Sequence, residues 1–161
     1  MENIIKKSSI IIANKGVKLV SNEKSLMGLI FDVKTKNLNQ VRIYQRNGKI
    51  LINCGCENSV RYGVNKFNIC KHKLSVIMYI WQEKLFEKFN PLYHNIFLKA
   101  FEILVSDSII QDNKFLVNGK ELVLIEGKYT TWLNIIGEKE PELTPERIAV
   151  LLKIVKDSNG K

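Results

Sequence analysis

Four residues that can bind a metal ion lie close together near the middle of the sequence: Cys54, Cys56, Cys70 and His72. The chain has only these three cysteines, and an odd number argues against a framework of disulfides. Three thiolates and one imidazole form a complete tetrahedral set for Zn²⁺, with sulfur at about 2.3 Å and nitrogen at about 2.0 Å from the ion. The pattern therefore predicts one structural zinc ion, because a catalytic zinc keeps a position open for water.

The first pair of cysteines follows a predicted β-hairpin. Asn47-Gly48 is a strong hairpin signal, because both turn residues must adopt positive φ. In an extended segment residues i and i+2 face the same side, so Cys54 and Cys56 can approach one ion. Gly55 between them has no Cβ and lets the backbone bend around the metal. Alternating segments flank the turn, at residues 41–45 and 50–52.

The second pair, Cys70 and His72, opens a predicted helix. Apolar residues recur at three- and four-residue spacing from Cys70 to about Phe89, which predicts a largely buried helix. Two other interpretations of the cysteines are weaker. Three buried thiols would not explain their polar surroundings, and a redox role for the Cys-x-Cys pair would leave His72 without a function.

Hydrophobic periodicity and turn residues predict the remaining elements. They are a strand or short helix over residues 1–13, a strand over 29–33, a helix over 92–105, a hairpin over 115–125, a strand or short helix over 129–136, and a last helix beginning at Pro145. Asn90 and Thr144 are good N-caps, and each precedes a proline that favours the first helical position. The order of strands, helices, strands and a helix predicts an α+β fold. We expect a zinc-binding region over residues 1–90 and a helix–hairpin–helix extension over 91–161 packed on it.

Positive charge is concentrated in the half of the chain that contains the cysteines. Residues 1–90 contain 16 Lys and Arg against 6 Asp and Glu, whereas residues 91–161 contain 9 against 10. This distribution favours a nucleic-acid partner, because neutralised phosphates release their counterions. The expected contact residues are Arg42, Arg46, Lys49, Arg61, Lys66, Lys71 and Lys73. Two alternatives stay open: the lysines form a solvated surface, and the interleaved Tyr62 and Phe67 pack a loop rather than stack on bases.

Cys-x-Cys followed by Cys-x-His, after a hairpin and at the start of a helix, resembles the SWIM-type zinc finger. The resemblance spans roughly Leu29 to Trp81. The four SWIM ligands correspond to Cys54, Cys56, Cys70 and His72. SWIM fingers occur in transposases, chromatin-remodelling ATPases, ubiquitin-ligase-like proteins and recombination mediators of Shu-type complexes. These mediators have alanine three residues after the histidine, where this chain has Ser75. The resemblance implies binding to DNA or to protein and does not choose between them.

Motif and charge together indicate two functions. The first is zinc-dependent DNA binding in recombination, repair or transcription, and the second is an adaptor that docks a RecA-like recombinase paralog or another protein. We expect no enzyme activity, since the chain shows no nucleophile elbow, paired carboxylates or P-loop, and the closed ligand set leaves no open metal position. Without a run of about 18 apolar residues or a clear signal peptide, the chain is expected to be intracellular, either cytoplasmic or nucleoid-associated.

Overall fold

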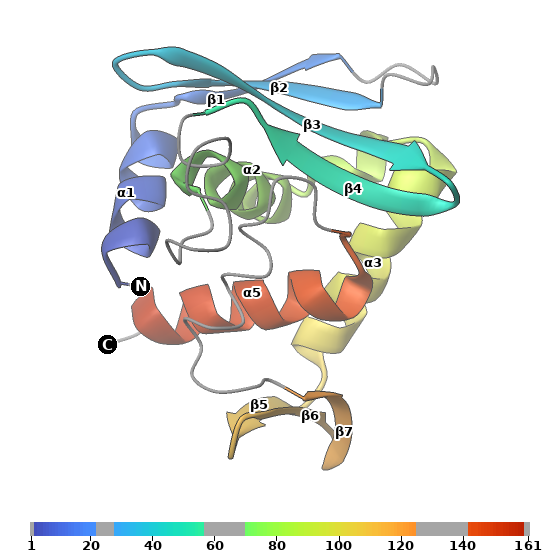
Figure 1. Ribbon diagram of the computed structural model, residues 1–161. Helices are drawn as coiled ribbons and strands as arrows, with labels where there is room; N and C mark the ends of the chain where they lie inside the picture. The colour runs from blue at the N-terminus through green and yellow to red at the C-terminus, as the bar shows by residue number, and fades with distance from the viewer. Residues whose placement is uncertain (1, 22–27, 57–69, 125–141, 160–161) are drawn as a thin grey trace.

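The computed structural model describes residues 2–21, 28–56, 70–124 and 142–159, and it confirms the predicted α+β class. A four-stranded antiparallel sheet in the order β1-β2-β3-β4 covers a layer of helices, and a smaller sheet, β5-β6-β7, lies on the far side of those helices (Figure 1). The elements are α1 (Glu2–Ala13), β1 (Val17–Ser21), β2 (Leu29–Lys34), β3 (Leu38–Arg46), β4 (Lys49–Cys54), α2 (Lys71–Gln82), the 3-10 helix η3 (Leu85–Lys88), α3 (Pro91–Val105), β5 (Ser108–Gln111), β6 (Lys114–Val117), β7 (Lys120–Leu124) and α5 (Pro145–Asn159).

The hairpin of β3 and β4 turns where the sequence predicts. Asn47 and Gly48 adopt φ values of 53° and 77°, and Arg46 pairs with Lys49 directly beside the turn. Side chains then alternate between the two faces of the sheet. The inner face contributes six completely buried apolar residues: Leu29, Phe31, Val33, Val41, Ile43 and Ile52.

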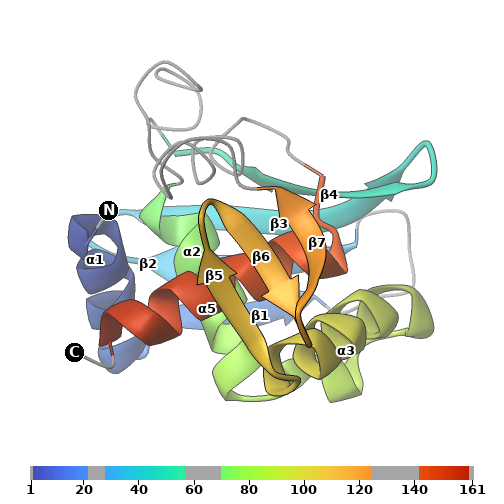
Figure 2. The ribbon, with the colours of Figure 1, turned by 90° about the horizontal axis from the view of Figure 1, so that it is seen from below.

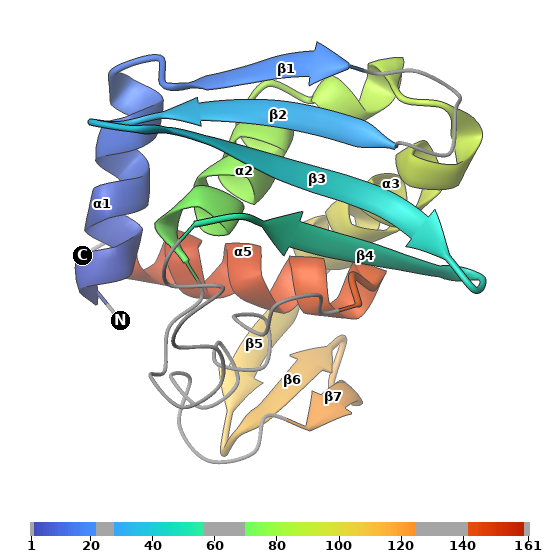
Figure 3. The same ribbon diagram turned by 45° about the horizontal axis from the view of Figure 1, so that its top comes forward.

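Helix α2 packs beneath this inner face, as Figure 3 shows with the four strands in front of it. It begins after Cys70, as predicted, but it ends at Gln82, before the predicted Phe89. Lys84 adopts φ of 51°, in the left-handed region, and a right-handed helix cannot continue through that conformation. The chain then forms η3, which buries Phe86.

Helices α1, α3 and α5 complete the core around α2. The N-terminal segment, which was predicted to be either a strand or a short helix, forms helix α1 and packs along α2. Helix α5 crosses below α2 and contacts α1 and α3 (Figure 2). Thr144 caps it as predicted, since its Oγ1 accepts a hydrogen bond from Arg147 N at 3.2 Å. One continuous apolar cluster runs from Ile5 in α1 to Val155 in α5, so residues of both halves of the chain share the core.

The smaller sheet contains one strand that the sequence analysis missed. The predicted hairpin forms between β6 and β7 at Asn118-Gly119, and β5 is added through a turn at Asp112-Asn113, with φ values of 51° and 63°. Asp and Asn tolerate positive φ, so these two residues were an available signal for the turn. Phe115 of β6 is fully buried and joins this sheet to the core. The predicted element over residues 129–136 lies outside the described residues.

Gly28 and Gly48 allow a test of the packing that aligns β2 with β3. Both have positive φ, but a Cβ on Gly28 would overlap the carbonyl oxygen of Ile43 and lie 2.9 Å from Tyr44 Cα, whereas one on Gly48 would meet nothing within 4 Å. We expect Gly48→Ala to lower the free energy of unfolding by about 1 kcal/mol through backbone strain, and Gly28→Ala to lower it by about 1–3 kcal/mol more through the added clash. Denaturant unfolding of the metal-loaded protein measures the difference, and equal losses would contradict the packing described.

Candidate metal centre

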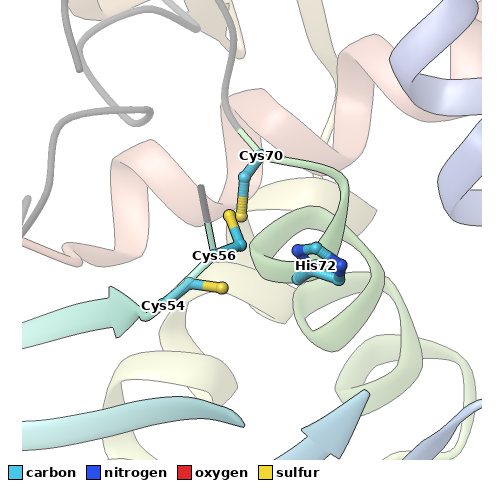
Figure 4. A group of neighbouring side chains, drawn as sticks. All are labelled: Cys54, Cys56, Cys70 and His72. Carbon is cyan, nitrogen blue, oxygen red and sulfur yellow. The ribbon is translucent and has the colours of Figure 1, made fainter. Parts of the chain in front are cut away.

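The four predicted ligands meet where β4 ends and α2 begins (Figure 4). Cys54 is the last residue of β4, Cys56 follows two positions later, Cys70 precedes α2 and His72 lies in its first turn. Their ligand atoms all lie within 4.8 Å of one another, and all four residues are buried. The cluster predicted from sequence spacing is therefore present, and its geometry is compatible with one metal ion.

Cys70 has two roles in this arrangement. It is the N-cap of α2, with extended backbone angles of φ −70° and ψ 146°, and its Sγ accepts a hydrogen bond from Lys73 N at 3.3 Å. An N-cap side chain normally satisfies one of the amide groups that the first helical turn leaves unpaired. The same helix end favours negative charge, so it suits a metal-bound thiolate.

His72 supplies the observation that best tests whether a metal fits. Its Nε2 lies 3.3 Å from the side-chain Nδ2 of Asn39 in β3, whereas its Nδ1 is buried and forms no well-directed hydrogen bond. Buried polar atoms almost always have a partner, and an unsatisfied one is costly. A metal ion among the three sulfur atoms would satisfy Nδ1, so the donor set fits the group.

The electrostatics of the metal-free cluster indicate which protons a bound metal ion would displace. Hydrogen bonding to Cys56 and to Cys70, followed by burial, raises the pKa of the Cys54 thiol far above its ordinary value. Burial lowers the pKa of His72, but its interactions with Cys56 and Cys70 outweigh that effect and raise the pKa to about 9. Without metal, Cys54 and His72 therefore keep their protons at neutral pH, and a bound dication would replace those protons.

The residues expected to contact nucleic acid do not all lie on one surface. Arg42, Arg46 and Lys49 lie on the outer face of β3 and β4, and Lys71 is partly exposed at the start of α2. Lys73 departs from the expectation, because its side chain is 0% exposed. Helix α2 packs against the sheet, α1 and α5, and Lys73 lies on a buried side of the helix, whereas Lys71, two residues earlier, does not. Arg61 and Lys66, together with Tyr62 and Phe67, lie outside the described residues.

One residue of the site was not anticipated from the sequence. Asn39 contacts His72 from β3, thirty-three positions away in the chain. An asparagine near the start of a strand carries no periodic or motif signal. Only the pairing of β3 with β4, which sets Val41 opposite Cys54, brings it to the cluster.

Comparisons with protein-family models, with curated proteins and with solved structures give no match for this chain. The likeness to the SWIM finger therefore rests on the four ligands and on the hairpin and helix that carry them. Among the described residues, no helix combines the length and the apolar character required to cross a membrane.

The two histidines of the chain provide a matched test of the metal centre. His94 lies on α3 with its Nδ1 2.7 Å from the carbonyl oxygen of Phe86, outside the cluster. We expect about one zinc per wild-type chain, near-complete loss of zinc in His72→Ala, and retention in His94→Ala, because only His72 completes the tetrahedral set. Elemental analysis after gel filtration measures this, and a wild-type protein without near-stoichiometric metal would contradict the assignment.

Metal binding should also release protons in a pH-dependent way. At pH 7 zinc must displace one proton from His72, whose pKa is raised to about 9, and one from Cys54, whose pKa is also raised. We therefore expect release of about two or more protons per zinc at pH 7, and an affinity that increases as pH rises toward about 9 and decreases as it falls. Calorimetry in two buffers of different ionisation enthalpy measures the number released. Binding that is independent of both buffer and pH would argue against ligation by these residues.

Proposed function

We propose that this chain is a structural-zinc protein that binds nucleic acid, with the zinc fixing a basic β-sheet on its helical layer. The sheet supports this function through its outer face, since all helices of the described residues lie on the opposite side (Figures 1 and 3). The described strands of this sheet place five cationic side chains on that outer face, against one carboxylate, Asp32. The five cations are Lys18, Lys34, Arg42, Arg46 and Lys49.

The single observation that carries the proposal is the concentration of these cations on one face of a rigid sheet. Phosphate contacts supply most of the affinity of nucleic-acid binding that is independent of sequence. Cations on paired strands have positions set by the backbone ladder, so several of them can contact phosphates of one nucleic acid at the same time. Asp32 is itself engaged, because its Oδ1 accepts a hydrogen bond from Gln40 Nε2 at 3.2 Å.

Arg42 adds a feature that suits single strands. Its guanidinium carbon lies 4.1 Å from the centre of the Tyr44 ring, so the planar cation is held against the aromatic face. Guanidinium planes and aromatic rings are surfaces on which unpaired bases stack. Tyr44 is itself only 5% exposed, so the stacking surface is the partly exposed guanidinium of Arg42, which the Tyr44 ring supports from below.

The resemblance to SWIM fingers makes recombination, repair or transcription the proposed process in which this binding serves. Zinc in this proposal is structural, and the function is binding without catalysis. Three thiolates and one imidazole complete the tetrahedral set, so substrate has no open position at the metal.

Neutralising single cations on the two sheets tests the proposal. Arg46→Gln and Lys49→Gln should each lower affinity for single- or double-stranded DNA and reduce the slope of log affinity against log salt by about 0.7–0.9, because each removes about one phosphate contact. Lys120→Gln, an equal loss of charge on β7 of the smaller sheet, is the matched control and should leave both quantities unchanged. Fluorescence anisotropy over a salt series measures them. No binding by the wild-type protein at low salt, or an equal effect of Lys120→Gln, would refute the proposal.

A second candidate function, protein–protein adaptor, is favoured by the β5–β7 sheet. Three of its apolar side chains are substantially exposed, Ile109 by 46%, Leu122 by 40% and Leu124 by 53%. Exposed apolar patches are typical of surfaces that bind other proteins. The resemblance makes a RecA-like recombinase paralog the proposed partner. Nuclease treatment separates the two functions, since a partner held by this sheet stays bound when nucleic acid is digested.

A further inference from the structure

His72 has two ring nitrogens, and only one of them can bind the metal. The choice matters because it fixes which nitrogen carries the remaining proton and what the rest of the protein must offer that proton. The environments of the two nitrogens differ: Nδ1 is buried and has no well-directed partner, while Nε2 lies 3.3 Å from the Asn39 side chain.

We propose that His72 binds the metal through Nδ1 and that Asn39 is its positioning residue, accepting a hydrogen bond from Nε2–H through Oδ1. The inference rests on the metal centre described above and assigns a role to a residue outside the four ligands. It accounts for both nitrogens, because the metal satisfies Nδ1 and Asn39 satisfies Nε2.

Metal binding through Nε2 instead would leave a buried polar atom of His72 without a hydrogen-bond partner. If Nε2 held the metal, it would lose its contact with Asn39, and Nδ1 would carry the proton. That Nδ1–H would then be a buried donor without an acceptor, since the structure provides no well-directed partner there. Buried donors in this state are rare and costly.

The amide of Asn39 can supply the acceptor without moving the backbone. Its oxygen and nitrogen occupy nearly equivalent positions, so a half-turn of the amide places Oδ1 where Nδ2 faces Nε2. A neutral histidine bound to metal through Nδ1 must carry its proton on Nε2, which then requires an acceptor. Histidine ligands of metals generally donate their second N–H to such a partner, which fixes the ring and raises its basicity.

The sheet brings Asn39 to the cluster in a fixed register. Asn39 of β3 pairs with Val33 of β2, and Val41, two residues further along β3, pairs with Cys54 of β4. Asn39 therefore shares the inner face with Val41 and points toward the first turn of α2, where His72 lies. The register of β3 thus sets both the partner strand residue Cys54, a ligand, and the partner of the histidine on the inner face.

Heteronuclear NMR of the histidine ring nitrogens in the zinc-loaded wild-type protein tests the assignment directly. We expect the Nδ1 of His72 to show the shift of a metal-bound nitrogen, and its Nε2 to carry a slowly exchanging proton; His94 serves as the internal reference. Loading with NMR-active cadmium should give metal coupling to Nδ1 only. Coupling to Nε2 would overturn this inference and leave the metal centre intact, whereas a wild-type protein that binds no zinc would remove both.

Three variants test the role of Asn39. Asn39→Leu removes the acceptor and should weaken zinc binding by about 10-fold or more and accelerate exchange of the Nε2 proton, whereas Asn39→Asp keeps an acceptor and should preserve both. Gln40→Leu, the next residue on the outer face, is the matched control and should behave like wild type. Competition with a chromophoric chelator measures affinity. If Asn39→Leu binds zinc like Gln40→Leu, or Asn39→Asp binds as weakly as Asn39→Leu, the proposed hydrogen bond is absent.

Discussion

The structure depends most on the meeting of three thiols and one imidazole at a single buried point. Without a cation these groups hold protons instead, because Cys56 and Cys70 raise the pKa of both Cys54 and His72. With a metal the same groups become a tetrahedral set that ties the end of β4 to the start of α2. The binding free energy of a structural zinc is then part of the folding free energy, since the site cannot exist in the unfolded chain.

The hydrophobic core and the metal centre stabilise different parts of the same sheet–helix contact. Apolar side chains such as Phe31, Ile43 and Ile77 fill the space between the sheet and α2, with α5 closing the core from below. These non-directional contacts hold the layers together over a large area. The metal centre is directional, so it fixes where the first turn of α2 sits relative to β3 and β4. Asn39, on the inner face of β3, extends that fixed arrangement beyond the four ligands.

Local signals in the sequence predict the two Asn-Gly hairpins, the caps at Asn90 and Thr144 and the positions of the ligands, but they do not predict features that tertiary contacts decide. Asn47-Gly48 encodes its turn in two residues, and Thr144-Pro145 encodes the start of α5. The end of α2 is different, because hydrophobic spacing continues past Gln82 while the backbone reverses at Lys84 to bury η3 against α3. The contact between Asn39 and His72 could not be predicted for the same reason, because it forms only after β3 and β4 have paired.

Strand register predicts which cations are exposed better than the number of charges along the chain does. Lys73 belongs to the basic half yet is buried, whereas Arg42 and Arg46 are offered outward because alternate residues of β3 share a face. The register that turns Arg42 outward also pairs Val41 with Cys54 and turns Cys54 inward, toward the metal. A slip of one residue would exchange the two faces of β4 and carry Cys54 away from the other ligands. Metal binding therefore favours the strand register that also forms the basic outer face. Through this register the metal centre determines which side chains the proposed nucleic-acid surface contains, although it does not contact that surface.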